Sequence, residues 1–295
     1  MSIQFAVLSS GSRGNASLVQ SGHAGMLIDF GIGPRELNAR LVGVGSSLSR
    51  IGSVVLTHTH GDHAHPATLR LMARWKISLY CHESHRERLG DKPGFRELDA
   101  AGLIRHYDDR PFMAPTGQRV EPVPLSHDGG PTFGFRIEIR GDKGKRPVAL
   151  GYMTDTGCWT EANADAMADV DVLGVEFNHD VAMQKESGRA PYLIYRNLGR
   201  RGHLSNDQGS GLVSAVLSRS NQGAVRDLIL LHLSDQCNRP ALAIRTARES
   251  VKAAGRRVAI HAATEGLAYP DLRVKPAPRR RSAAGAVAGF PWEQG

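Results

Sequence analysis

The chain has 295 residues, of which 41% are hydrophobic and 22% are charged, proportions typical of a folded globular protein. Its longest apolar runs are strand-sized, well short of the ~20 residues needed to cross a bilayer, so we expect no membrane association. The N-terminus lacks the basic start and apolar stretch of a secretory signal, which makes the cytoplasm the expected compartment. The formal net charge of +8 favours a polyanionic partner, because lysine and arginine neutralise phosphates and release counterions.

The first half of the sequence predicts mainly strands. Alternating apolar residues predict a hairpin whose strands flank the turn-forming residues 9–15. A third strand is predicted at residues 25–30, followed by a short helix at 34–41 with a proline in its first turn. A continuous apolar strand at 52–57 leads directly into a cluster of histidines, and a helix is predicted at 67–75. Chemistry is therefore expected at the end of a strand.

The second half of the sequence mixes strands and helices. Further strands are predicted at residues 78–81, 118–125, 132–139, 147–154, 170–176, 227–231 and 258–261. Helices are predicted at residues 161–168, 207–218 and 240–254. This order favours an α+β fold in which two packed sheets carry helices on their outer faces. We expect one domain over residues 1–271 and a basic, disordered tail over 272–295, where Pro, Arg, Ala and Gly follow one another without periodicity.

The strongest functional feature is the segment HTHGDH at residues 58–63, which packs four potential metal ligands into six residues. Neutral imidazole and carboxylate are the ligands that suit zinc and its neighbours among the transition metals. In an extended segment, alternation places His58 and His60 on one side, while a turn at the glycine can bring Asp62 and His63 toward a second position. The segment therefore predicts two adjacent divalent metal ions, Zn²⁺ or Mn²⁺.

The motif HxHxDH after the strand VVLTH resembles the metallo-β-lactamase superfamily. The resemblance implies an αββα sandwich, and it identifies further metal ligands by the segments VPLSH, GYMTD and LILLH, which end in His127, Asp155 and His232. It also implies that the aspartate of LIDFG, Asp29, supports the site by hydrogen bonding.

The resemblance further implies how the ligands are shared. One metal would be held by three histidines, His58, His60 and His127. The other would be held by Asp62, His63 and His232. Asp155 would bridge the two metals.

Four segments resemble one branch of this superfamily, the YycJ/WalJ-like nucleases: LSSGSRGNASLV (8–19), GVEFNHD (174–180), GHLSND (202–207) and LHLSDQCN (231–238). The resemblance covers about residues 3–255 and implies a metal-dependent phosphodiester hydrolase that uses a metal-bridging hydroxide. Specifically, it implies a 5′-to-3′ exonuclease that acts on DNA in preference to RNA.

Within this branch, the predicted catalytic residues are Asp62 and His203, with His203 contacting phosphate or donating a proton. Predicted substrate contacts are Ser12, Asn15, Asn178, His203, Ser205 and Asn206, and Glu176 is predicted to support the metal ligands. Alternatives remain open for several of these residues. The glycine-rich opening that contains Asn15 is equally typical of a plain hairpin turn, and Ser205 or Asn206 would serve equally as a helix cap.

A basic stretch with interleaved aromatic residues suits contacts with a nucleic-acid backbone and stacking on a base, and it contains Arg189, Tyr192, Tyr195, Arg196, Arg200 and Arg201. A solvated basic helix is the equally weighted alternative.

For the whole protein the alternatives are a thioester or lactone hydrolase of the glyoxalase-II type, a phosphodiesterase for small cyclic phosphodiesters, and a metal-stabilised binding module. The sequence leaves the oligomeric state open.

Overall fold

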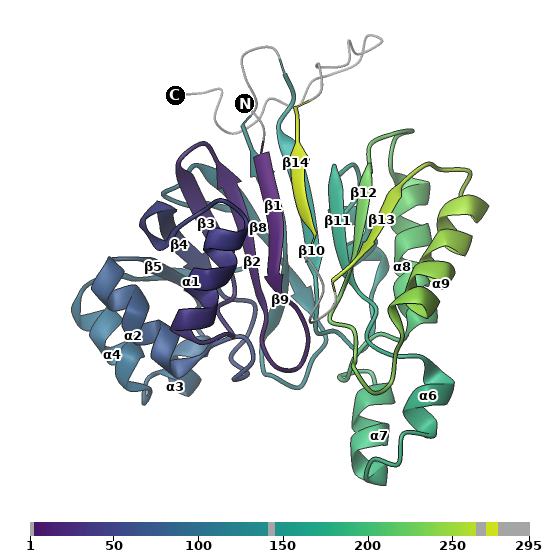
Figure 1. Ribbon diagram of the computed structural model, residues 1–295, viewed down its shortest axis with the longest axis horizontal. Helices are drawn as coiled ribbons and strands as arrows, with labels where there is room; N and C mark the ends of the chain where they lie inside the picture. The colour runs from purple at the N-terminus through teal and green to yellow at the C-terminus, as the bar shows by residue number, and fades with distance from the viewer. Residues whose placement is uncertain (1–2, 141–144, 264–269, 277–295) are drawn as a thin grey trace.

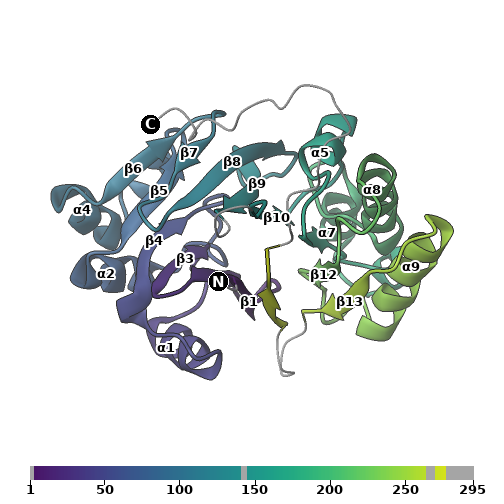
Figure 2. The same cartoon turned by 90° about the horizontal axis from the view of Figure 1, so that it is seen from above.

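The computed structural model describes residues 3–140, 145–263 and 270–276, and within them two seven-stranded sheets pack face to face. Helices cover the outer side of each sheet, as Figures 1 and 2 show from two directions. The αββα sandwich expected from the sequence is therefore confirmed.

The first sheet has the strand order β14-β1-β2-β3-β4-β5-β6. Its strands are β1 (Ile3–Ser9), β2 (Ala16–Ser21), β3 (Ala24–Ile28), β4 (Ile51–Val55), β5 (Ser78–His82), β6 (Ile104–Tyr107) and β14 (Asp271–Val274). Its outer helices are α1 (Pro34–Gly43), α2 (Pro66–Trp75), α3 (His85–Leu89) and α4 (Pro93–Ala100). Strands β3 to β6 run parallel to one another, so their carboxyl ends meet at one edge.

The second sheet has the strand order β13-β12-β11-β10-β9-β8-β7. Its strands are β7 (Phe112–Met113), β8 (Gln118–Leu125), β9 (Thr132–Ile139), β10 (Val148–Met153), β11 (Val172–Glu176), β12 (Asp227–Leu231) and β13 (Ala259–Ala262). The remaining helices are α5 (Glu161–Ala166), α6 (Val181–Lys185), α7 (Pro191–Leu198), α8 (Asn206–Arg219) and α9 (Pro240–Ala253). Figure 1 shows α6 and α7 set apart from α8 and α9, at one end of the sandwich.

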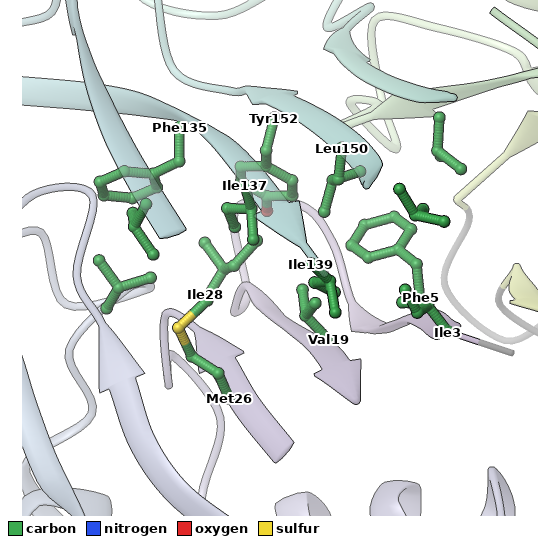
Figure 3. Close-up of a cluster of buried hydrophobic side chains, with 14 of the residues drawn as sticks. Ile3, Phe5, Val19, Met26, Ile28, Phe135, Ile137, Ile139, Leu150 and Tyr152 are labelled. Atoms are coloured by element: carbon green, nitrogen blue, oxygen red, sulfur yellow. The ribbon is translucent and has the colours of Figure 1, made fainter. Parts of the chain in front are cut away.

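The core between the sheets follows from residues that alternate along each strand. In β10, Leu150 and Tyr152 face the opposite sheet, whereas Ala149 and Met153 face the outer helices. In Figure 3 these inward side chains meet those of the first sheet, such as Phe5. Two further apolar clusters complete the core, one between the first sheet and its helices and one between the second sheet and its helices. Burial on both faces holds the strand ends rigidly, and these ends carry the polar residues described below.

The strands and helices predicted from the sequence are present, with ends that shift by a few residues. The sequence did not predict α3, α4, β6, β7, α6 or β14, and it predicted a helix at α7 only as one of two interpretations of the basic stretch. Strand β14 spans Asp271–Val274 and pairs with β1, so the first sheet continues past the expected boundary at residue 271. The predicted tail lies outside the described residues from position 277 onward. No helix in the described part of the chain is long and apolar enough to cross a membrane.

Candidate active site

The predicted metal ligands lie where strands end. Asp29 follows β3, the HTHGDH segment at residues 58–63 follows β4, Asp155 follows β10, and His232 directly follows β12. His127 comes two residues after β8, which runs in the same direction as β10. The two sheets thus deliver side chains from distant parts of the sequence to one edge of the sandwich.

Three residues of the site adopt a left-handed backbone conformation. Asp29, Asp155 and His232 have φ angles of 61°, 56° and 55°, and they make up three of the five non-glycine residues of this kind in the described ranges. Such a conformation costs on the order of 1 kcal/mol or more and persists where the surroundings enforce it, commonly at functional sites. Each strand therefore ends in a sharp turn at a residue whose side chain enters the site.

The first predicted metal group converges as expected. His58, His60 and His127 present ring nitrogens within 4.8 Å of one another. Nδ1 of His60 lies 3.3 Å from Nε2 of His127. Two nitrogen ligands at 2.0–2.1 Å from a tetrahedral zinc lie about 3.3–3.4 Å apart, so this spacing fits a metal ion. Nε2 of His58 is buried without a hydrogen-bond partner among the described residues, which also fits a nitrogen that binds a cation.

The second group contains Asp62, His63 and His232, again with ligand atoms within 4.8 Å of one another. Asp155 lies between the groups. Its Oδ2 is 3.1 Å from Nε2 of His63, and its Oδ1 is 3.5 Å from Nε2 of His232 and 4.0 Å from Nε2 of His127. Like that of His58, Nε2 of His232 is buried and makes no hydrogen bond within the described ranges, although two carboxylates lie within 3.9 Å of it. Asp155 thus lies within 4.0 Å of histidines from both groups.

Electrostatics at this edge favour cations. Burial opposes the charge of Asp155, but His232 and His63 hold its pKa well below the usual range. Burial would lower the pKa of His232, yet Asp155, Asp62 and Glu176 raise it to about 10. The carboxylates are therefore ionised and surround the ring of His232 with negative charge. Conversely, burial lowers the pKa of His58, which keeps its ring neutral and able to bind a metal.

Asp29 orients His63 from behind. Its Oδ2 lies 2.7 Å from Nδ1 of His63, and its Oδ1 accepts a hydrogen bond of 2.8 Å from the backbone N–H of Thr57. Because Nδ1 is engaged, Nε2 of His63 is the nitrogen turned toward Asp155. A carboxylate behind a ligating histidine fixes its tautomer and raises its basicity. This is the supporting arrangement that the sequence predicts for Asp29.

Glu176, the last residue of β11, is a fully buried hydrogen-bond centre. Its Oε1 lies 2.7 Å from Nδ1 of His203 and 3.2 Å from Nδ1 of His232, while Oε2 accepts from the N–H groups of Thr156 and Leu204. Burial opposes its charge, but His203 and His232 lower its pKa to about 2. Asp155, Glu176, His203 and His232 also form a group with metal-ligand spacing. Because both oxygens of Glu176 already accept hydrogen bonds, we interpret it as orienting the two histidines.

Beside His232 opens a pocket of about 390 Å³. Its polar lining comes from five segments of the chain and includes Ser12, Asn178, Arg189, Arg196, Asn197, His203, His232, Ser234 and Gln236. Of the predicted substrate contacts, Ser12, Asn178 and His203 line this pocket. Asn178 also donates a hydrogen bond of 2.9 Å to the backbone oxygen of His232, which couples the pocket wall to a predicted ligand.

The other predicted substrate contacts have buried partners of their own. The side chain of Asn15 bonds to the backbone of Gly11 across the glycine-rich turn and approaches His63. Ser205 is the N-cap of α8 in a capping box, and Asn206 pairs with Asn238. None of these three lines the pocket. The structure therefore agrees with the turn alternative for Asn15 and with the capping alternative for Ser205, whereas Asn206 is the first residue of α8 and does not cap it.

Several residues near the site were not predicted from the sequence. Asp128 lies 3.8 Å from Nε2 of His60 and forms an ion pair with Arg196, 68 residues away. Gly129 lies against His58 so closely that an added Cβ would overlap its ring. The backbone oxygen of Gly202 lies 2.9 Å from Nδ1 of His127. The HDGG run that begins at His127 is a local signal for Gly129. The contacts of Asp128 and Gly202 are brought together only by the fold.

Comparison with known proteins identifies the family. Residues 26–232 match the Beta-lactamase superfamily domain. The chain is 25% identical over 245 residues to the exodeoxyribonuclease WalJ of Streptococcus pneumoniae, which covers 82% of this chain and 86% of that protein. It is equally identical over 245 residues to the exodeoxyribonuclease YycJ of Bacillus anthracis, with 82% and 87% covered.

Among solved structures, the metallo-β-lactamase fold protein YhfI from Bacillus subtilis superposes with a TM-score of 0.66. That match covers 92% of this chain and all of YhfI at 16% identity, and it supports the fold alone. The chain belongs to the β-lactamase superfamily and resembles its YycJ/WalJ-like members. It is a metal-dependent hydrolase, as the sequence predicts.

Proposed function

We propose that the chain is a nuclease that removes nucleotides from the 5′ end of DNA, acting from 5′ to 3′. The observation that carries this proposal is the pocket beside His232, in which Arg189 and Arg196 face the same space as His203. Two guanidinium groups and a histidine suit a phosphodiester, because arginine carries a permanent positive charge and donates hydrogen bonds to phosphate oxygens. A thioester or lactone offers no such charge. The names of the two relatives support DNA as the substrate.

We further propose that the site holds two divalent metal ions, Zn²⁺ or Mn²⁺. His58, His60 and His127 would hold one, Asp62, His63 and His232 the other, and Asp155 would contact both. When bound, such a metal pair makes water nucleophilic near neutral pH and balances charge on the attacking and leaving oxygens.

The protein's own residues would then position and protonate the substrate. Asp62, about a quarter exposed, would accept a hydrogen bond from the attacking water. Ser12 and Asn178 would bind phosphate oxygens in the pocket. Glu176 engages Nδ1 of His203, which leaves Nε2 as the nitrogen available to the substrate. As the new oxygen–phosphorus bond forms and the bond to the 3′ oxygen breaks, His203 would donate a proton to that oxygen. The product then carries a 5′-phosphate.

The decisive experiment uses DNA and RNA, single- and double-stranded, labelled at either end and incubated with protein loaded with Zn²⁺ or Mn²⁺. We expect release of 5′-mononucleotides, beginning at the 5′ end of DNA. Release that begins at the 3′ end would refute the polarity, and faster cleavage of RNA would refute the preference for DNA. Hydrolysis of a thioester or lactone with no cleavage of any polynucleotide would refute the nuclease proposal as a whole.

Metal analysis tests the dinuclear site independently of substrate. Seven converging ligands cannot all be satisfied around one ion of coordination number four to six. We therefore expect close to two metal ions per folded, metal-replete chain. A stoichiometry of one would contradict the second site.

A further inference from the structure

Two tyrosines stand out on the surface of the molecule. Tyr192 and Tyr195 in α7 are 70% and 78% exposed, more than any other large hydrophobic side chain of the described ranges. Because they are three residues apart in a helix, their side chains lie next to each other on one face. The other strongly exposed large side chains, Val42, Trp75 and Met113, come from separate elements.

The adjoining face of α7 forms part of the candidate active site. Leu193, Arg196 and Asn197 line the pocket that also contains His203 and His232. The helix is therefore a wall of the pocket, and because Tyr192 lies four residues before Arg196, the tyrosine pair borders the face that lines the pocket. Figure 1 shows that α7 lies at the end of the sandwich, away from the helices that cover the sheets.

Several contacts fasten this wall to the site. Nη2 of Arg196 donates a hydrogen bond of 3.0 Å to Asp128, and Nε of Arg189 donates one of 3.0 Å to Gln236. After the helix, the backbone oxygen of Arg200 accepts from the hydroxyl of Ser126. The tyrosine pair is thus held at a fixed position relative to the predicted ligands.

The local sequence around the pair is rich in positive charge. Residues 187–203 contain four arginines and no acidic residue. Arg200 and Arg201 are exposed just beyond the C-terminal end of α7. Such a surface attracts a polyanion, and aromatic rings beside arginines are typical of sites where nucleic-acid bases stack while phosphates meet cations.

We propose that Tyr192 and Tyr195 stack on the bases of a single-stranded polynucleotide whose end occupies the pocket. This inference rests on the proposed nuclease function and names the form of substrate that the site takes. In a duplex each base already stacks on its neighbours inside the helix, so only an unpaired strand offers its base faces to the tyrosines. The platform would hold unpaired nucleotides next to the scissile end.

The test compares Tyr192→Ala/Tyr195→Ala with Tyr192→Phe/Tyr195→Phe, which keeps the rings. Binding is measured by fluorescence anisotropy with metal-loaded protein and labelled phosphorothioate oligothymidylate, which resists hydrolysis. Since each stacked base contributes at least about fivefold to affinity and the alanine variant removes two rings, this variant should bind at least about 30-fold more weakly. The phenylalanine variant should bind like the wild type. The variant Trp75→Ala, which removes an exposed aromatic residue on α2, is the matched control and should change nothing.

Equal affinity of the wild type and the alanine variant would overturn the proposal, as would an equal loss of affinity for a blunt duplex of the same length. Turnover of bis(p-nitrophenyl) phosphate, which offers no base, should be unaffected by the alanine changes. Failure of the nuclease proposal would be recognised separately, as a wild-type protein that cleaves no polynucleotide.

Discussion

At the scale of single residues, His203 occupies the most informative position in the site. It lines the pocket, yet its Nδ1 is engaged by Glu176 rather than left free for a metal. Its side chain is 13% exposed, whereas Glu176 behind it is fully buried. A histidine held from behind by a carboxylate, with its second nitrogen at the pocket, is arranged for proton transfer or phosphate contact.

We predict that His203→Ala keeps the metal content normal and lowers turnover of DNA by about 10²–10⁴-fold, the usual loss for a positioned proton donor. An ester with a p-nitrophenolate leaving group, which needs little protonation, should lose much less. Steady-state rates on both substrates, with metal analysis, check this. The control is His106→Ala, which removes an exposed histidine of β6. Loss of a metal ion would instead identify His203 as a ligand.

Two glycines near the metal ligands make a matched pair for a second prediction. A Cβ on Gly129 would overlap Cδ2 of His58, whereas a Cβ on Gly61 would meet nothing within 4 Å. Neither glycine has a positive φ, so the backbone tolerates alanine at both positions. Gly129→Ala should displace the His58 ring and weaken metal binding by at least about tenfold, comparable to losing a supporting contact. Gly61→Ala should bind metal normally.

Metal retention during titration with a chelator measures the difference between these variants. Equal affinities would mean that the loop at Gly129 yields and that His58 keeps its place. Comparable circular dichroism of the two variants would exclude a general folding defect.

At the scale of elements, the sequence predicts best where one signal dominates. Strand β4 and the ligand-bearing segment after it form an unbroken apolar run followed by HTHGDH, and both were predicted from those residues alone. Helix α7 was expected only as one of two interpretations of a basic and aromatic stretch, because its face toward the pocket is polar as well as apolar. Its contact with the site depends on the ion pair of Arg196 with Asp128, which no local pattern reveals.

Glu176 illustrates the same limit. The sequence predicted a supporting role for it from its segment, but its four hydrogen-bond partners come from three distant segments. Long-range hydrogen bonds of this kind follow from the strand order, since β11 lies between β10 and β12. The ligands carried a local motif, whereas the groups that orient them did not.

Helix α3 leads to a prediction about pH. His85 at its start is buried; its Nδ1 accepts from the N–H of His82 and its Nε2 donates to the backbone oxygen of Pro131, 46 residues away. Burial lowers the pKa of His85 from 6.5 to about 4. The unfolded chain therefore takes up a proton near pH 6.5, but the folded chain does so only near pH 4. Stability from this residue is complete above pH 6.5 and is lost as the pH falls from 6.5 to 4.

The loss expected over this window is up to about 3 kcal/mol, the equivalent of the lowered pKa. It is measured as the difference between wild type and His85→Gln in the free energy of unfolding at pH 8 and pH 4. Loss of metal in acid affects both proteins and cancels in the difference. A difference that stays constant with pH would refute the assignment.

At the scale of the whole molecule, the two sheets and the site depend on one another. Parallel strands of both sheets end at the same edge, and the predicted ligands come from β4, β8, β10 and β12. Neither sheet alone could hold the seven ligands. The contact of Asp155 with His63 spans the interface between the sheets, so packing of the apolar core between them fixes the spacing of the two metal groups.

The C-terminal part of the chain yields a prediction at this scale, because structure and charge divide it at a definite place. Strand β14 pairs with β1 through four residue pairs, and Val274 is buried with the core between the sheets. Beyond the described residues, positions 277–295 contain three arginines and one acidic residue. Truncation after Pro276 should therefore keep the melting temperature but reduce the salt dependence of nucleic-acid binding. The slope of log affinity against log salt should fall by up to about 2–3, and turnover of a small phosphodiester should be unchanged.

Truncation after residue 269 also removes β14, uncovers the edge of β1 and exposes core residues, so it should lower the melting temperature by several degrees. Calorimetry and salt titrations on the two truncated proteins separate these effects. A collapse of small-substrate turnover in the shorter deletion would show that the arginine segment belongs to the active site rather than to the general attraction of a polyanion.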